Sequence, residues 1–428
     1  MTKYKTRSIF YGWWNVLCAF IGLALSHATI AIFSFGTFVK PLQAEFGWQR
    51  GEIAFALTVN NLTVLIVSPL LGILIDKIGV RKVLMPSLML LAVIVATMTL
   101  LSGNIWHFYI LYFLIPLFGA ATLPHSYSRI IIAWFYRLRG MALGISLAGI
   151  GAGAAVIPVL MQSVINSHGW RTAYMVYALL VLLISLPLSY YLVRETPKEM
   201  GLKADGDHES TDRDKGQMAS GAIKSIGLTL KQSIKTSTFW LMLGSFLLAG
   251  MVMSSMFVHL IPMLIDRGLD PSVAAYGAMA LGVSLIVGRI ASGFLMDHFF
   301  APYIAAIFLS GMVVGMVIFA TGTSGPMVFV AAALVGLASG SEMSEASYLI
   351  SRYFGYLAFG RIYGVIFSAF QLGGAIGAPV LGIYQDKAGD YIGALWVLVA
   401  VGLVSTILIA LLREYPQLEF NMEANDDT

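Results

Sequence analysis

Gly72-Ile-Leu-Ile-Asp76-Lys77-Ile-Gly79-Val-Arg81-Lys82 ends one long apolar run and leads into the next. A copy of its beginning, Gly293-Phe-Leu-Met-Asp297, follows 221 residues later, again at the end of an apolar run. Gly79 permits a tight turn, and Asp76 can accept charge-assisted hydrogen bonds or cap a neighbouring helix N-terminus. An internal repeat of this length predicts two halves of similar build.

Two further pairs of segments support the repeat. Residues 128–135 match residues 347–354 at an offset of 219, and the Gly-rich segments that end at Pro158 and Pro379 match at an offset of 221. The repeat therefore extends through most of each half.

The composition indicates a polytopic membrane protein. Hydrophobic residues make up 58% of the 428 and charged residues 11%, against roughly 25% charged in an ordinary soluble domain. Cys18 is the single cysteine, which excludes an internal disulfide and a Cys-based metal site.

Twelve apolar runs are long enough to cross a bilayer, which takes about 20 residues. The first six are residues 11–38, 53–75, 82–102, 106–133, 141–165 and 171–193. The second six are residues 238–262, 273–296, 302–322, 326–353, 362–384 and 391–412. Runs of this length without period-2 alternation exclude a β-barrel. We therefore expect an all-α membrane protein with twelve transmembrane helices in two pseudo-symmetric six-helix halves.

The distribution of Lys and Arg predicts the orientation. With a cytoplasmic N-terminus, that side receives most of the basic residues, and the opposite side receives only Lys40, Arg50, Arg171, Arg267 and Lys387. Both termini are then cytoplasmic, and we expect a multi-pass protein of a plasma membrane, the inner membrane if the cell is bacterial. Because six is even, the halves insert in the same orientation as parallel repeats.

The same patterns divide the chain into four parts. Residues 1–193 form the first half and residues 237–413 the second. Between them, residues 194–236 are rich in charged residues, Gly and Ser and predict a flexible cytoplasmic linker. Residues 414–428 form an acidic cytoplasmic tail.

The segment at residues 72–82 resembles the loop signature of the major facilitator superfamily, and its degraded copy at residues 293–297 has Phe300 in place of the turn glycine. Together with twelve spans and a mid-chain linker, this resemblance covers essentially the whole chain. It implies the major facilitator fold.

A narrower resemblance rests on four shorter segments. They are Tyr11-Gly12-Trp13-Trp14, residues 134–144, Gly169-Trp170-Arg171 and Arg352-Tyr353-Phe354-Gly355. They look like the branch that contains monocarboxylate transporters and oxalate:formate antiporters, whose members move small organic anions, often with protons. The arginine of that branch in span 8 corresponds to Arg289 here.

This chain also departs from that branch. Where the antiporters carry a lysine in span 11, the matching position here is Phe370, with Gln371 beside it. The lysine of animal-type monocarboxylate transporters in span 1 has no counterpart around His27 and Ala31. With a second fixed cation missing, dicarboxylate exchange is not expected.

Charged residues inside apolar spans are functional candidates. Arg289 can hold a carboxylate through its planar fork, or pair structurally with a neighbouring carboxylate such as Glu342. Glu342 and Glu345 lie three apart on one broad helix face. Either can carry a coupled proton, or both can be ionised and paired.

The remaining candidates are polar residues of the spans. His27 and His125 are either proton carriers or histidines bonded within the bundle. Arg129 is expected to form a gating salt bridge with Glu345 across the halves, or else to reach towards the lipid interface. The full set comprises Arg289, His27, Asn60, Asn61, Tyr127 and Gln371 for substrate, Glu342, Glu345 and His125 for proton coupling, and Asp76, Arg81, Arg129, Glu345 and Asp297 for gating.

The sequence offers no Walker A motif, nucleophile triad, metal-binding cluster or nucleic-acid-binding face, so no enzyme, cofactor, metal or nucleic acid is expected. We therefore expect a monomeric secondary transporter, embedded in the lipid bilayer, that moves a monocarboxylate together with a proton by alternating access. The alternatives are an exporter of amphipathic compounds or drugs, an anion exchanger, and a non-transporting receptor built on a transporter fold.

Overall fold

The computed structural model describes residues 10–206, 227–322 and 325–416. The first group of helices comprises α1 (Gly12–Ala24), α2 (Phe35–Phe46), α3 (Arg50–Ile78), α4 (Val80–Thr97), α5 (Ile105–Gly119), α6 (Pro124–Trp134), α7 (Arg139–Leu180) and α8 (Leu186–Leu192). After α9 (Leu230–Ile234), the second group comprises α10 (Ser237–Asp266), α11 (Pro271–His298), α12 (Ala301–Ala320), α13 (Met327–Tyr353), α14 (Phe359–Ala388) and α15 (Ile392–Ala410). This is the all-α architecture that the apolar runs predict.

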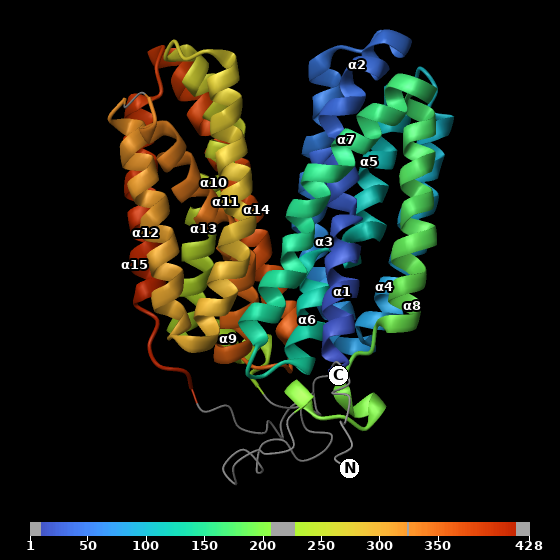
Figure 1. Ribbon diagram of the computed structural model, residues 1–428, viewed down its shortest axis with the longest axis vertical. Helices are drawn as coiled ribbons and strands as arrows, with labels where there is room; N and C mark the ends of the chain where they lie inside the picture. The colour runs from blue at the N-terminus through green and yellow to red at the C-terminus, as the bar shows by residue number, and fades with distance from the viewer. Residues whose placement is uncertain (1–9, 207–226, 323–324, 417–428) are drawn as a thin grey trace, which may run out of the picture.

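The two groups stand side by side in Figure 1. We call the end of the bundle where α1 begins and α15 ends the terminal end, and the opposite one the far end. Helices of the two groups lie close together near the terminal end, and their ribbons lie farther apart towards the far end (Figure 1).

One helical segment is long enough for two membrane crossings. Within the described ranges, eleven segments are long and apolar enough to span a membrane, and one of them, Arg139–Leu192, has 54 residues. A straight helix of that length would measure about 80 Å, more than twice the hydrocarbon thickness. Gly169 interrupts it with φ 83° and ψ 166°, and the chain turns back there (Figure 1). The twelve predicted crossings are accounted for in this way.

The fourth span is broken where the sequence dictates it. The residue before a proline is pushed towards extended backbone, and Leu123, which precedes Pro124, has φ −78° and ψ 165°. Pro124 then starts α6, a position that needs no N–H donor. The predicted span over residues 106–133 is confirmed as the segment Ile105–Trp134, and a 3₁₀ turn (Ala120–Thr122) divides it into α5 and α6.

The first span breaks at the same level. The predicted single run over residues 11–38 is α1, a π-helical turn (Thr29–Phe33) and α2, which continues to Phe46. The N–H of His27 donates to the Thr122 hydroxyl at 3.0 Å, and the Tyr177 hydroxyl donates to the Ser26 carbonyl at 2.7 Å. The Thr122 hydroxyl thus supplies an acceptor for the His27 N–H at the break. The Ser26 carbonyl, which also accepts from the N–H of Thr29 at 3.0 Å, gains a second donor in Tyr177.

The internal repeat is visible in hydrogen bonds at the terminal end. The Trp134 indole N–H, after the fourth span, donates to the Arg194 carbonyl at 2.7 Å. At the matching place in the second group, 219 residues on, the Tyr353 hydroxyl donates to the Arg413 carbonyl. Both contacts fix the end of a six-span group to the end of its own fourth span.

The exterior is apolar over much of its area. Large side chains such as Ile66, Val159 and Leu183 are more than 60% exposed. In a soluble protein such a surface would aggregate, whereas in a bilayer it contacts lipid tails.

Candidate functional site

The first seam between the two groups joins α3 to α14 at the terminal end. The Asp76 carboxylate accepts hydrogen bonds from the backbone N–H groups of Gly360 (3.1 Å) and Arg361 (2.9 Å), in the first turn of α14. The same carboxylate pairs with the Arg129 guanidinium of α6, and both side chains are buried. Gly72 permits this approach, because a Cβ there would collide with the Gly360 carbonyl. Asp76 thus places negative charge at the positive end of a helix from the other group.

The second seam joins α11 to α7 in the equivalent way. The Asp297 carboxylate accepts hydrogen bonds from the N–H groups of Gly140 (2.6 Å) and Met141 (2.8 Å), in the first turn of α7. A Cβ on Gly140 would collide with the carbonyl of Gly293. The repeated aspartates of the sequence therefore cap two helices, each belonging to the opposite group.

Arg81, a predicted gating residue, lies away from both seams. Its N–H donates to the Glu195 carboxylate at 2.9 Å, and its guanidinium donates to the Tyr190 carbonyl at 2.8 Å. Tyr190 belongs to α8 and Glu195 lies just after it, at the start of the predicted linker, so Arg81 fastens the chain around the end of α8 to the start of α4.

The predicted ion pair between Arg129 and Glu345 is absent. Arg129 is paired with Asp76, and its guanidinium lies over the Tyr356 ring, 4.8 Å from the centroid. Its charge is already balanced by a carboxylate of its own group, so none is left for Glu345. Where the two helices cross, the Ser347 hydroxyl donates instead to the Ser128 hydroxyl at 2.9 Å.

The start of the predicted linker is attached to the terminal end. Asp205 accepts hydrogen bonds from the N–H groups of Tyr136 (2.8 Å) and Arg137, between α6 and α7. Burial raises the pKa of Asp205, and these hydrogen bonds oppose the rise. Residues 207–226 of the predicted linker, and residues 417–428 of the predicted tail, lie outside the described residues.

Arg289 lies in the second seam, about two helical turns farther from the terminal end than Asp297. Its side chain is 5% exposed, and its Nη1 donates to the Leu147 carbonyl of α7. Its Nε has no hydrogen-bond partner among the described residues. The pseudo-symmetric position in α3, 221 residues earlier, is Ser68, so the first seam has no equivalent cation. A guanidinium here has donor capacity left for an anion.

Two carboxylates of α13 share the interior of the second group with Arg289. Glu342 is 4% exposed and Glu345 is 2% exposed. Glu342 interacts electrostatically with both Arg289 and Glu345, and no ion pair within 4.0 Å joins these described residues. The structure therefore brings three of the predicted charged residues together.

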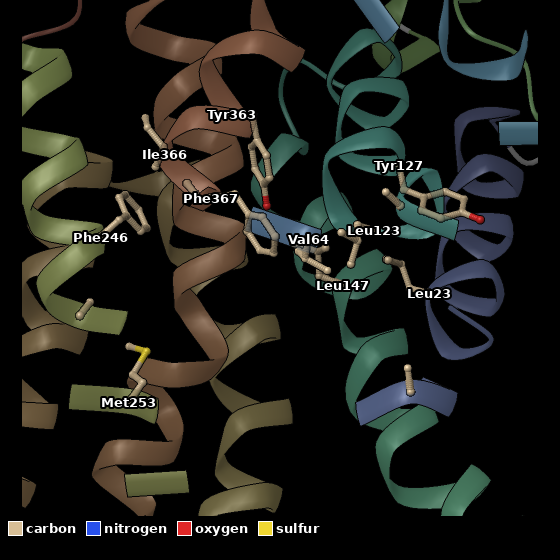
Figure 2. Packing of buried hydrophobic residues seen from close by; sticks show 14 of the residues in the cluster. Leu23, Val64, Leu123, Tyr127, Leu147, Phe246, Met253, Tyr363, Ile366 and Phe367 are labelled. Atoms are coloured by element: carbon tan, nitrogen blue, oxygen red, sulfur yellow. The ribbon is translucent and has the colours of Figure 1, made fainter. Parts of the chain in front are cut away.

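Tyr363 of α14 is a member of this group that the sequence reasoning missed. It interacts electrostatically with Arg289 and Glu342, and its ring centroid lies 5.8 Å from that of His125. Figure 2 shows Tyr363 and Phe367 directed towards Leu123 and Leu147 of the first group. The sequence signal that could have identified Tyr363 is its position beside a packing glycine, Gly364, where a Cβ would collide with the Ser68 carbonyl.

Two predicted residues lie inside the first group. His27 packs at the break of the first span, where a Cβ on Gly119 would approach it to 3.0 Å. Tyr127 points away from Phe367 towards α1 (Figure 2), and a Cβ on Gly22 would collide with its hydroxyl. The structure does not bring Tyr127 to the other candidates, whereas His27 interacts electrostatically with His125.

Of the polar candidates of α3 and α14, one is buried and two lie farther from the terminal end than the last hydrogen bond described between these helices. Asn60 is fully buried, and its side-chain amide Nδ2 donates to the side-chain Oδ1 of Asn61 at 3.3 Å. Asn61 is exposed and lies one turn farther from the terminal end than Leu65, whose carbonyl accepts a hydrogen bond of 2.8 Å from Ser368. Gln371 is half-buried, close to one turn beyond Ser368 in the same direction. Asn61 and Gln371 therefore lie where the first seam ends.

Among the described residues, no group of three or more His, Cys, Asp or Glu side chains could hold a metal ion. The arrangement is instead that of two capped seams at one end and a buried group of charges beside them.

A family model described as the Major Facilitator Superfamily matches residues 19–378. The chain belongs to this superfamily. It is therefore a multi-pass integral membrane protein of a superfamily of transporters, as the loop signature predicts.

Curated relatives from the superfamily include monocarboxylate transporter 13 of Rattus norvegicus, which is 26% identical over 399 residues, 89% of this chain and 84% of that protein. Monocarboxylate transporter 11 of Homo sapiens is 26% identical over 391 residues, 89% of this chain and 78% of that protein. The chain therefore resembles the monocarboxylate transporter branch.

Solved structures share the fold. The human organic anion transporter MFSD10 superposes with a TM-score of 0.72 at 16% identity, covering 93% of this chain and 99% of that one. The fucose:proton symporter of E. coli gives 0.68 at 17% identity, covering 92% and 97%.

Proposed function

We propose that this protein is a secondary active transporter that moves a small organic anion, a monocarboxylate, together with a proton. The observation that carries the proposal is Arg289, a buried arginine whose Nε is unpaired and whose Nη1 is held by a carbonyl oxygen. A buried guanidinium is stabilised by a bidentate carboxylate, which matches its planar fork. The resemblance to monocarboxylate transporters supports the same substrate class.

Alternating access is the mechanism we assign. The two groups, residues 1–193 and 237–413, are the moving halves, joined by the linker at 194–236. Because the backbone contacts at Gly72 and Gly140 hold the halves together at the terminal end, we assign substrate entry to the far end in this arrangement. We place the terminal end, with both chain termini, in the cytoplasm.

Asn61 and Gln371 are proposed as polar contacts for the rest of the substrate. Both lie beyond the hydrogen bond between Ser368 and Leu65, on opposite halves. Asp76, Arg129 and Asp297 form the gate at the terminal end.

The test is uptake into proteoliposomes from a panel of labelled carboxylates, with and without an imposed pH gradient. Arg289→Gln should reduce monocarboxylate uptake about 100-fold, because removing one partner of a buried hydrogen-bonded charge pair costs roughly 2–5 kcal/mol. Lys40→Gln, which removes an exposed cation of α2, is the matched control and should leave uptake unchanged.

Three results would each overturn a part of the assignment. Normal carboxylate uptake by folded Arg289→Gln protein removes Arg289 from the substrate site. Failure of the native protein to move any carboxylate in either direction rejects the substrate class, in favour of an exporter of amphipathic compounds. Uptake that needs a second carboxylate on the opposite side, and ignores the pH gradient, indicates an anion exchanger.

A further inference from the structure

At the terminal end, an arginine of each half contacts a tyrosine of the other half. Arg129 of α6 lies over the ring of Tyr356, in the loop between α13 and α14, 4.8 Å from the centroid. Arg352 of α13 lies over the ring of Tyr136, in the loop between α6 and α7, 5.9 Å from the centroid. Both distances are those of cation–π contacts. The two loops therefore contribute equivalent rings, each of which receives a guanidinium from the opposite half.

The two contacts differ in how the arginine is held. Arg129 has Asp76 as its ion-pair partner, whereas Arg352 forms no ion pair with any residue that the structure describes. The guanidinium of Arg352 lies instead 4.6 Å from the ring centroid of Tyr415, in the segment that follows α15. Arg352 is thus in contact with two tyrosine rings, one from its own half and one from the other.

Tyr415 is itself fixed to the second half. Its hydroxyl accepts a hydrogen bond of 3.1 Å from the N–H of Ala301, one of the donors that the start of α12 leaves free. Its ring packs on Phe300 and Tyr353, with centroids 5.0 and 5.1 Å away. Two residues earlier, the Arg413 carbonyl accepts a hydrogen bond from the Tyr353 hydroxyl. This segment therefore has a defined position between the start of α12 and the end of α13.

A like charge lies beside the contact between Arg352 and Tyr136. Arg139 of α7 also lies over the Tyr136 ring, 5.7 Å from the centroid, and its guanidinium donates to the Ser351 hydroxyl of the other half at 3.0 Å. Two guanidiniums directed at one ring repel each other, and a long side chain at a half-buried position can turn its charge into water. The ring of Tyr415 opposes this movement of Arg352.

We propose that Tyr415 is a positioning residue of the gate, which holds Arg352 against Tyr136 and thereby stabilises the closed terminal end. The proposal rests on the alternating access that we assign to this protein, and it extends the gate to a residue beyond the last span. The contact between Arg352 and Tyr136 joins the halves, so it separates whenever the terminal end opens. The contacts of Tyr415 are with its own half, so Tyr415 stays beside Arg352 and returns it to Tyr136 when the end closes.

The experiment measures the opening of the terminal end by the labelling rate of a cysteine at Ser347, in a background with Cys18 replaced by serine. Tyr415→Ala removes the ring from Arg352, and the labelling rate should rise about threefold, as the loss of one cation–π contact predicts. Tyr276→Ala is the matched control, because Tyr276 lies on α11 and is 61% exposed; it should leave the rate unchanged. A native labelling rate for Tyr415→Ala overturns the proposal.

Two further variants separate positioning from a general loss of structure. Arg352→Gln should raise the labelling rate by itself, and Tyr415→Ala should then add nothing, because Tyr415 acts through Arg352. Tyr415→Phe keeps the ring on Arg352 and removes the hydroxyl that accepts from Ala301, so its rate should be closer to the native rate than to that of Tyr415→Ala. The proposal is overturned if Tyr415→Ala raises labelling equally with and without Arg352, or if Tyr415→Phe labels as fast as Tyr415→Ala.

The same measurements distinguish a failure of this proposal from a failure of the proposed function. Labelling needs no substrate, so its result stands even if no carboxylate is taken up by proteoliposomes. A native labelling rate for Arg352→Gln would show that the contact with Tyr136 does not hold the terminal end closed, and the role of Tyr415 would fall with it.

Discussion

Asp76 and Asp297, 221 residues apart, hold the terminal end together from opposite sides, since each carboxylate caps the first turn of a helix in the other half. The two contacts differ in one respect. Asp76 also neutralises the buried Arg129, whereas the residue that corresponds to Arg129 near Asp297 is Tyr348. The two seams are alike in backbone geometry, but Asp76 forms an ion pair with its arginine, whereas Asp297 interacts with the buried Arg139 at longer range, without an ion pair within 4.0 Å.

This difference predicts unequal effects of removing the two carboxylates. Asp76→Asn leaves a buried arginine uncompensated, a loss of roughly 3–5 kcal/mol, whereas Asp297→Asn weakens a helix cap, a loss of about 1–2 kcal/mol. We expect Asp76→Asn to open the terminal end more strongly. Labelling of a cysteine at Ser347, in a background with Cys18 replaced by serine, measures this opening, and equal labelling rates in the two variants would contradict it.

The ion pair between Asp76 and Arg129 also predicts that the effects of the two single substitutions are not additive. Arg129→Gln alone leaves Asp76 with its backbone donors and the more distant Arg361 guanidinium, whose Nε is 3.9 Å away, and Asp76→Asn alone removes the ion-pair partner of Arg129. The double variant removes both charges, so its labelling rate should lie below the sum of the two single effects. Additive effects would show that Asp76 and Arg129 act separately.

The glycines of the seams provide a steric prediction. Gly72→Val adds atoms where a Cβ already collides with the Gly360 carbonyl, so the terminal end cannot close and transport should fall at least tenfold. Gly282→Ala is the matched control, because a Cβ there meets nothing within 4 Å; it should keep native transport and stabilise α11 slightly. Native uptake by Gly72→Val would show that this seam does not need to close.

Local features of the fold could be predicted from the sequence, because they depend on backbone chemistry. Gly79, predicted as a turn glycine, has φ 91°. Asp76, at the end of an apolar run, caps the first turn of α14, a role that the sequence suggested. The break at residues 25–28 could not be predicted from the sequence, because the N–H of His27 donates there to the Thr122 hydroxyl, 95 residues away.

The buried charged residues could be predicted only in part, because their pairing depends on residues far apart in the sequence. Arginine and glutamate inside apolar runs are conspicuous, so Arg289, Glu342 and Glu345 could be selected by position alone. Which charges pair depends on helix rotation, which a sequence does not specify, and Arg129 was therefore assigned to Glu345 instead of Asp76. Tyr363 was missed because a tyrosine in an apolar helix carries no charge to mark it.

Tyr363 gives a further prediction. Its ring packs on His125 and Phe367, with centroids 5.8 and 6.2 Å away, so Tyr363→Phe should preserve this packing. The substitution removes the hydroxyl, which donates to the Met343 Sδ at 3.4 Å and interacts electrostatically with Arg289 and Glu342. We expect KM for the monocarboxylate to rise about tenfold, the loss of one hydrogen bond to a charged group, with the melting temperature unchanged. A Tyr363→Phe protein with native KM would show that the hydroxyl plays no part in anion binding.

Arg289→Lys separates charge from geometry at the proposed substrate site. Lysine keeps the positive charge for Glu342 but has no planar fork and a shorter reach, so one of two parallel hydrogen bonds to a carboxylate is lost. We expect KM to rise about 10- to 100-fold while the protein stays folded and uptake remains measurable, in contrast to Arg289→Gln. The comparison is made with initial rates of uptake across a range of substrate concentrations. If lysine restored the native KM, Arg289 would act as a point charge, and the bidentate binding that we assign to it would be wrong.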